Sequence, residues 1–335
     1  MEKEREVKLS SAEISSLWTA YLNNSMSICI MKYFFKIVDD EEIKPVIEYA
    51  LTLTIRYNEL IKKIMEKEDF PIPHGFTEQD VQISAPRLFT DIFLIHFVKS
   101  MAKVGLGTYS LARTLSTRQD VRSLFKECVD TTMELDDRAL GVMLNKGILI
   151  RPPYIPVPDE ARFIEKKNFM NGFFGERRPL TGPEITQLFI NMDTNLLGES
   201  LMTAFGQVAE SKQIRDLMWR GKEIAKKHAI IFAQKLKDDN IAIPSIWDTS
   251  ITNSQIAPFS DKLMLFVTTF LIAAGIGNYG LAASTSMRRD LSFMYVRLTS
   301  EVALFAEDSA EFLIEKGWME EPPQAPDRKK LIIGE

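Results

Sequence analysis

The stretch LSSAEI at residues 9–14 decides the fold, because it returns as LTGPEI at residues 180–185. Further matches follow at a step of 171 residues and, beyond one loop, at a step of 170 residues. They include Asn24 and Asn195, Pro73 and Pro244, Tyr109 and Tyr279, Gly147 and Gly317, and Pro152 and Pro322. A nearly fixed offset that persists over about 145 residues is typical of a tandem duplication.

Each copy has the pattern of four helices. The motifs S-x-x-E at 10–13 and T-x-x-E at 181–184 are capping boxes, which satisfy free backbone N–H groups at a helix start. Apolar side chains then recur at helical spacing, and a glycine follows each fourth helix. We expect a hydroxyl together with Asp120 or Asp290 to cap the start of that helix. No stretch alternates as a strand does, so the sequence predicts an all-α protein.

Loop lengths predict how these helices connect. Only a few residues join the first helix to the second and the third to the fourth, which makes these pairs antiparallel neighbours. About 15 residues separate the second helix from the third, enough to cross a bundle, so each copy is expected to be a ferritin-like four-helix bundle. The expected divisions are residues 1–150 for the first bundle, 151–179 for a linker, 180–321 for the second bundle and 322–335 for a tail.

The composition is that of an ordinary globular protein, with 45% hydrophobic and 26% charged residues among 335 and a net charge of −5. No basic tail supplies the phosphate contacts of a general nucleic-acid binder, so no nucleic-acid partner is expected. Cys29 and Cys128 are too few for a disulfide framework, and the N-terminus has no apolar signal segment. We therefore expect a cytoplasmic protein.

One stretch is apolar enough to raise the question of a membrane. Residues 263–287 carry no charge, which exceeds the ~18 residues that a spanning helix needs. The corresponding stretch of the first copy contains Asp91, His96, Lys99 and Lys103. Two copies of one fold are not expected in different solvents. We therefore interpret the stretch as a helix buried on most sides by its neighbours, with no membrane span.

Two glycine pairs fall inside predicted helices: Gly105 and Gly107, and Gly275 and Gly277. Glycine costs up to ~1 kcal/mol in a helix interior, so the pairs are expected where another helix approaches closely. A phosphate-binding loop would need a preceding strand and a third glycine, and the sequence has neither.

The linker combines a proline-rich part with an aromatic part. Residues 151–158, RPPYIPVP, should be extended and semi-rigid. Phe163, Phe169, Phe173 and Phe174 follow, which is more aromatic surface than a free linker carries. We expect these rings to pack on a bundle or between the two bundles, and they are the candidate interaction surface.

A di-iron site of the ferritin type is not expected. Such a site needs Glu-x-x-His on two helices, because positions i and i+3 face the same side. Position i−3 is Phe93 for His96 and Ala225 for His228. The third histidine, His74, falls in the first crossover loop.

The second bundle can still hold a charged interior layer. Counting ~1.5 Å per residue along the helices places Asp193, Asn278 and Glu301 at the height of His228. One hypothesis is a single metal ion or polar ligand, with His228 as nitrogen ligand and the carboxylates as oxygen ligands. The alternative is a core histidine with one hydrogen-bond partner and carboxylates that point to solvent. The sequence leaves both open.

Several motifs resemble a known family: APRLFTD at 85–91, GLGTY at 105–109, RGKEIAKKH at 220–228, FSDKLM at 259–264 and AAGIGNYG at 273–280. Over nearly its whole length the chain is similar to an uncharacterised family of spore-forming Gram-positive bacteria, whose units are similar to spore coat protein F. The resemblance implies a ferritin-like fold and a link to sporulation or to the forming spore. It implies no catalytic residues.

Three functions are compatible with these observations. The first is a non-catalytic structural or interaction protein, without a cofactor, whose partner is an unknown protein or a second copy of itself. The second is a protein that binds an apolar small molecule inside a bundle. The third is an enzyme with a single metal ion in the second bundle.

Overall fold

The computed structural model describes residues 7–243 and 251–333. Its long helices are α1 (Ser11–Ile37), α2 (Lys44–Lys67), α3 (Asp91–Leu115), α4 (Gln119–Asn145), α5 (Gly182–Val208), α6 (Lys212–Asp238), α7 (Asp261–Thr285) and α8 (Arg289–Glu315). Its short helices are η1 (Glu78–Asp80), η2 (Lys167–Met170) and α9 (Arg328–Ile333). Within the described residues the chain has no strand beyond two isolated bridges, and the all-α prediction is confirmed.

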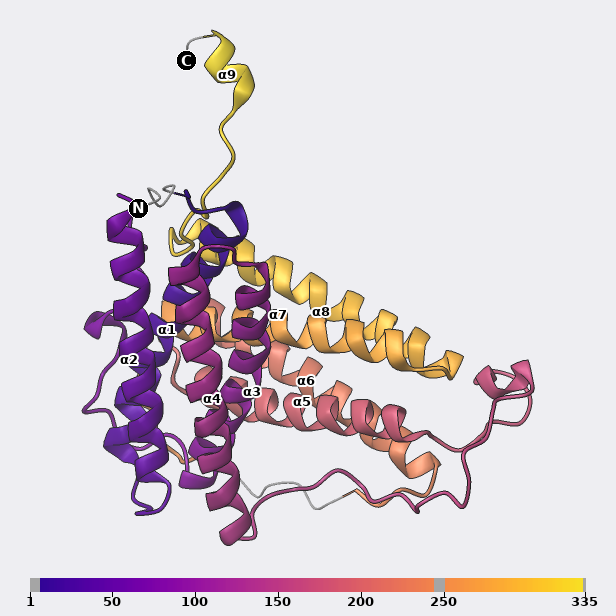
Figure 1. Cartoon of the computed structure of the whole chain (residues 1–335). Helices are drawn as coiled ribbons and strands as arrows, with labels where there is room; N and C mark the ends of the chain where they lie inside the picture. Colours follow the sequence, from indigo (N-terminus) through magenta and orange to yellow (C-terminus); the bar gives the residue numbers. More distant parts are fainter. Residues whose placement is uncertain (1–6, 244–250, 334–335) are drawn as a thin grey trace.

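Helices α1–α4 form one four-helix bundle and α5–α8 form a second (Figure 1). In the first bundle α1 packs against α2 and α3 against α4, and the second bundle repeats this pairing. A long crossover joins the two helix pairs of each bundle. The helices of the first bundle run across those of the second rather than along them (Figure 1).

Glu13, at the start of α1, holds two helix ends at once. Its Oε2 accepts the backbone N–H of Ser10 at 2.8 Å, which closes the predicted capping box. Its Oε1 accepts the backbone N–H groups of Thr117 and Arg118, both at 2.8 Å, where α4 begins. Burial acts to raise the pKa of Glu13, but the hydrogen bonds from these three N–H groups lower it to about 2. Glu184 is its counterpart and joins α5 to α8 in the same way.

The starts of α4 and α8 therefore differ from the expectation. Arg118 and Arg288 occupy the N-cap positions and provide no side-chain cap. Asp120 and Asp290 instead pair with these arginines, at 2.6 and 2.9 Å. The predicted hydroxyl caps are wrong, because a glutamate from the neighbouring helix already satisfies these free N–H groups. Asp120 does accept the backbone N–H of Val121 at 2.9 Å, whereas Asp290 accepts from the Arg288 and Lys235 side chains.

The two crossovers pair with each other symmetrically. Val81 forms an antiparallel bridge with Phe259, and Phe89 forms one with Ile251. A step of 170 residues turns Val81 into Ile251 and Phe89 into Phe259, so each bridge is the image of the other. Tyr33 adds an edge contact to Phe259, with ring centroids 5.2 Å apart. The two halves thus meet as the subunits of a two-fold dimer do.

Among the described helices, α7 alone has the length and composition of a membrane span, and 39% of its most apolar window is buried. A single such helix is weak evidence, because the core helix of a soluble protein has the same composition. Phe266 packs against Phe76 of the first crossover, with centroids 4.9 Å apart. Burial is less complete than expected because one face of α7, with Gly277, Gly280 and Leu281, is exposed.

Candidate functional site

A hydrogen-bonded layer crosses the interior of the second bundle. His228 on α6 is fully buried, with Nδ1 3.0 Å from the Tyr279 hydroxyl on α7 and Nε2 3.2 Å from Oε2 of Glu301 on α8. Asn195 on α5 donates its amide N–H to the Tyr279 hydroxyl at 2.8 Å. At the surface, Lys227 pairs with Glu301 at 2.7 Å. Each helix of the bundle therefore contributes to one layer.

The charge of this layer stays at its outer end. Burial lowers the pKa of His228, although its hydrogen bond to Glu301 acts in the opposite direction. Burial acts to raise the pKa of Glu301, but hydrogen bonds from Lys227 and His228 lower it. A neutral imidazole can accept the Tyr279 O–H at Nδ1 and donate Nε2–H to the Glu301 carboxylate. The layer is thus a directed chain of hydrogen bonds from the interior to the surface.

The other two residues expected at this height lie elsewhere. Asp193 on α5 interacts with Lys103 of α3, in the first bundle, and burial raises the pKa of its carboxyl group while Lys103 acts to lower it. Asn278 is half-buried on α7, and the residue after it, Tyr279, enters the layer instead. The structure therefore brings His228 and Glu301 together, but neither Asp193 nor Asn278 joins them.

The described residues contain no group of three or more His, Cys, Asp and Glu side chains placed to hold a metal ion. His228 and Glu301 supply two ligand atoms, and each already has a hydrogen-bond partner. The geometry is that of a hydrogen-bonded core histidine.

The first bundle has an uncharged version of this layer. The repeat places Tyr57 and Thr131 at the positions of the histidine and the glutamate, and their hydroxyl oxygens are 2.5 Å apart. Tyr109 donates its hydroxyl to Oδ1 of Asn24 at 3.0 Å. Asn24 is 2% exposed, and its Nδ2 has no hydrogen-bond partner among the described residues. A buried donor left unpaired costs about 1–3 kcal/mol.

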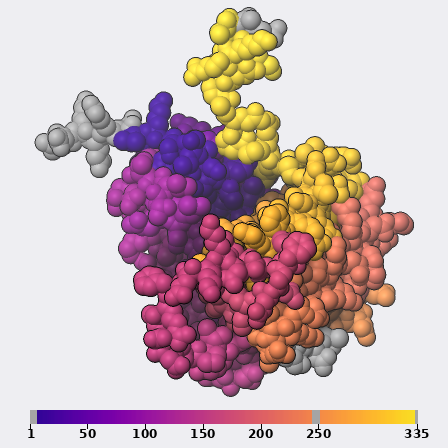
Figure 2. Space-filling view, turned by 90° about the vertical axis from the view of Figure 1, so that its right-hand side faces the viewer, coloured from indigo at the N-terminus to yellow at the C-terminus, as the bar shows by residue number. Residues whose placement is uncertain are grey.

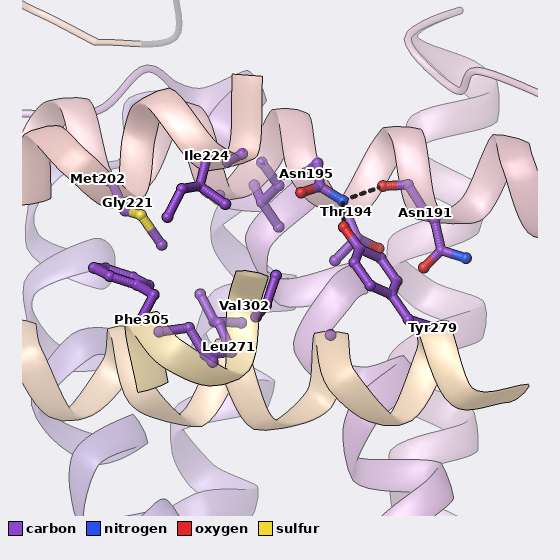
Figure 3. A pocket seen from close by; sticks show the side chains of 15 residues that line it. Asn191, Thr194, Asn195, Met202, Gly221, Ile224, Leu271, Tyr279, Val302 and Phe305 are labelled. Carbon is purple, nitrogen blue, oxygen red and sulfur yellow. Dashed lines mark hydrogen bonds between the residues drawn. The ribbon is translucent and has the colours of Figure 1, made fainter. Parts of the chain in front are cut away.

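Each layer borders an inner cavity of about 70 Å³. In the second bundle this cavity has a polar end at Asn195 and Tyr279 and an apolar end at Met202 and Phe305 (Figure 3). Most residues that line this cavity have their repeat counterparts among the residues that line the inner cavity of the first bundle. Pockets for drug-sized ligands are about 300–1,000 Å³, so neither inner cavity alone has the size expected of a ligand site.

A larger opening lies beside the inner cavity of the first bundle, and we call it the α1–α3 groove. Its volume is about 310 Å³, and it shares Asn24 and Tyr109 with the inner cavity. Residues of four helices bound it, among them Ser16, Thr19 and Asn24 of α1, Leu111 and Leu115 of α3, Phe125 of α4 and Phe270 of α7.

Only one of the four predicted glycines has a close neighbour. A Cβ added to Gly105 would lie 3.3 Å from the Tyr109 ring and 3.6 Å from Thr132 on α4. A Cβ added to the other three would meet no neighbouring atom within 4 Å: Gly107, Gly275 and Gly277. The prediction of close helix packing is therefore wrong for these three, because the nearest helices leave room for a side chain.

Gly277→Ala is expected to raise the free energy of unfolding by about 0.5–1 kcal/mol, because alanine loses less backbone entropy in a helix. Urea unfolding of the two proteins measures the difference. Gly221→Ala is the matched control, since its Cβ would lie 2.5 Å from Sδ of Met202 and 2.6 Å from Cζ of Phe305. Crowding there should cancel the gain or reverse it. Equal gains at both positions would contradict the prediction.

The aromatic part of the linker is fixed to the second bundle at two points. The Arg178 guanidinium lies over the Phe169 ring, 4.0 Å from its centroid, and pairs with Glu184 at 2.7 Å. Phe173 packs against Phe293 of α8, with ring centroids 5.7 Å apart. Phe173 therefore packs on a bundle, and Phe169 packs on a linker arginine that pairs with α5.

The remaining linker rings point into solvent. Phe163 is 98% exposed and Phe174 is 88% exposed. In the proline-rich part, Tyr154 and Val157 are also largely exposed. Figure 2 shows the pink linker spread over the surface turned toward the viewer. The expected packing on a bundle holds for Phe173, is indirect for Phe169 through Arg178, and fails for Phe163 and Phe174.

Sequence reasoning assigned no role to the residues that complete the two polar layers. Asn24 and Asn195, like Tyr109 and Tyr279, are identical across the duplication. These identities establish the repeat, and they were also the available signal for the site. Polar residues that stay the same at equivalent positions, each buried in at least one copy, mark the layers.

The comparisons with known proteins address the family and the fold. No curated protein is significantly similar to the chain. The crystal structure of a putative spore coat protein from Bacillus halodurans C-125 is 23% identical, with a TM-score of 0.41, over 45% of this chain and 98% of that chain. A family described as a protein of unknown function (DUF3231) matches residues 2–160 and again residues 168–331. Since both halves match one family, the chain belongs to the DUF3231 family.

Proposed function

We propose that this protein is a non-catalytic interaction protein, which binds a protein partner through its linker, in the cytoplasm and at the forming spore. The observation that carries the proposal is the exposure of large aromatic rings on an anchored segment, because Phe163 and Phe174 lie almost wholly in solvent. The motifs resemble those of a family whose units are similar to spore coat protein F, which supports the placement at the spore.

The anchoring of the linker favours binding. A segment that is already ordered loses less conformational entropy when a partner binds. Arg178 and Phe173 fix the chain on either side of Phe174, so that ring is presented from a held backbone. Aromatic side chains contribute much of the binding energy in protein interfaces. Tyr154, which is 85% exposed, adds a further aromatic ring to the solvent-exposed side chains of the linker.

Site-specific photocrosslinking tests the proposal. A benzophenone amino acid replaces Phe163 or Phe174 in the full chain, expressed in sporulating cells of the native host. We expect illumination to add the mass of a second, different protein to the 38.2 kDa chain, with one dominant product at both positions.

The matched control is the same amino acid at Leu304, which is 64% exposed on α8, away from the linker sequence. The product should be absent there, and Phe163→Ser with Phe174→Ser should prevent co-purification of the partner. A product of equal yield at Leu304 would contradict the proposal. A product that contains only a second copy of this chain would replace the proposed partner by self-association.

A further inference from the structure

We propose that the α1–α3 groove of the first bundle binds an uncharged small molecule with an apolar body and one oxygen acceptor, held by Nδ2 of Asn24. This function is independent of the linker and its partner. One of the three functions compatible with the sequence is binding of an apolar small molecule inside a bundle. The present proposal assigns that function a site and a ligand chemistry.

Asn24 supplies the polar contact. Its side chain is 98% buried and lines both the groove and the inner cavity beneath it. Oδ1 is taken by the Tyr109 hydroxyl, which fixes the orientation of the amide. Nδ2 is left without a partner within the described part of the chain. Nδ2 is itself buried, so a carbonyl or hydroxyl oxygen in the groove would accept that N–H after the side chains that cover it move aside.

The lining determines the charge of the ligand. None of the described residues that line the groove carries a charge. A charged ligand would lose its hydration there without gaining a counter-ion, which disfavours it strongly. The ligand is therefore neutral.

The volume determines the size of the ligand. At about 310 Å³ the groove reaches the range of small-molecule sites. It is roughly twice the 150 Å³ of an engineered cavity that binds benzene, so a ligand has on the order of a dozen heavy atoms.

The two walls of the groove differ. Ser16 and Thr19 place hydroxyl groups along the α1 side, and Leu111 and Leu115 place apolar side chains along the α3 side. Phe270 of α7 closes the groove with a ring from the second bundle. A ligand with an apolar body against α3 and an oxygen toward Asn24 fits this division.

The second half of the chain is an internal control for this site. At the positions of Ser16 and Thr19 it carries Gln187 and Ile190, which have larger side chains. The cavity described beside the polar layer of that half is the inner one, of about 70 Å³. The duplication therefore supplies two larger side chains that this fold accepts at the positions of Ser16 and Thr19.

The test uses the full chain, one fluorescent reporter and two competitors, of which only one has a hydrogen-bond acceptor. Prodan, a neutral naphthyl ketone whose emission shifts in an apolar site, reports occupancy. Two competitors displace it: 2-acetonaphthone, which has a carbonyl, and 2-isopropenylnaphthalene, a hydrocarbon of nearly the same shape in which a CH2 group replaces the carbonyl oxygen. We expect saturable prodan binding and at least about tenfold tighter binding of the ketone than of the hydrocarbon.

Two variants assign the binding to the groove. Asn24→Leu should abolish the preference for the ketone while the hydrocarbon still binds. The double variant Ser16→Gln with Thr19→Ile carries the residues found at these positions in the second half. It should remove binding of prodan and of both competitors, and circular dichroism should show an unchanged fold. These two positions lie at the surface side of α1, so this pair tests the groove even where the Asn24 variant is unstable.

A matched pair of leucines completes the design. Leu111, 59% exposed, lines the groove, whereas its counterpart Leu281, 56% exposed, lines none of the described cavities near it. Leu111→Ser should weaken probe binding about tenfold or more, and Leu281→Ser should leave it unchanged. Absence of prodan binding, or undiminished binding in the Ser16 and Thr19 double variant, would overturn the proposal. Equal affinity for ketone and hydrocarbon would overturn the role of Asn24.

Discussion

Acidification from pH 6.5 to pH 3 is expected to lower the free energy of unfolding by roughly 3–5 kcal/mol through His96 alone. His96 on α3 is buried, with 9% of its surface exposed. Burial lowers its pKa from 6.5 to about 3, although a hydrogen bond with the Ile148 backbone acts in the opposite direction. Below pH 6.5 the unfolded chain binds a proton that the folded chain excludes. Stability is therefore full above pH 6.5 and falls as the pH is lowered.

His96→Phe tests this expectation with a residue that the duplication itself supplies. Phe266 occupies the equivalent position of the second half. Urea unfolding at pH 7 and at pH 4 should show a clearly smaller loss on acidification for the variant than for the parent chain. Part of the slope should remain, because burial also lowers the pKa of His228, which has the same sign of effect. An unchanged slope in His96→Phe would rule out His96 as the source.

Arg288→Ala is expected to cost about 3–5 kcal/mol of stability, because it breaks a buried ion pair and leaves the Asp290 carboxylate with Lys235 as its remaining partner. The Arg288 side chain is fully buried at the start of α8. Its guanidinium donates to Asp290 at 2.9 and 3.1 Å and reaches Asp239 at 3.4 Å. It also donates to the backbone carbonyl of Arg178, which joins the linker to the bundle. Loss of the Arg288 side chain would therefore break the contact with the end of the linker as well as the ion pair.

The first half provides the control for this substitution. Arg118 is the equivalent of Arg288, and it pairs with Glu68 and Asp120 at 2.6 Å. Asp120 is 38% exposed, so water replaces the lost partner at lower cost. We expect Arg118→Ala to cost about 1–2 kcal/mol. Thermal and urea unfolding of both variants compare the two losses. Equal losses would contradict the role of burial.

Much of the fold could be predicted because its signals are local or repeated. The capping boxes mark the starts of α1 and α5 within four residues each. Gly147 and Gly317 end α4 and α8 with positive φ angles of 66° and 65°, as their place after a helix predicted. The fixed offset between copies then extended each local signal to the whole chain.

Part of the candidate site could be predicted because the sequence gives the level of a residue along the helix axis more accurately than the direction of its side chain around that axis. The rise of ~1.5 Å per residue placed His228 and Glu301 at one level, where they do meet. One residue changes the direction of a side chain by about 100°, since a turn takes 3.6 residues. The predicted residue Asn278 therefore misses the layer by one position, and Tyr279 joins His228 instead. Asp193 is predicted at the same level, but its side chain interacts with Lys103 of the first bundle.

The two sides of the contact between the crossovers can change in sequence independently, which the two sides of a homodimer contact cannot. In a homodimer one mutation changes both sides of a two-fold contact, so a harmful effect is doubled. Here Val81 and Ile251 occupy equivalent places in the two bridges but are encoded separately. The peptide linkage also holds the two halves together at an effective concentration on the order of millimolar, so a weakened contact does not separate them. Each half can therefore diverge alone, as the buried pair His228 and Tyr57 already illustrates.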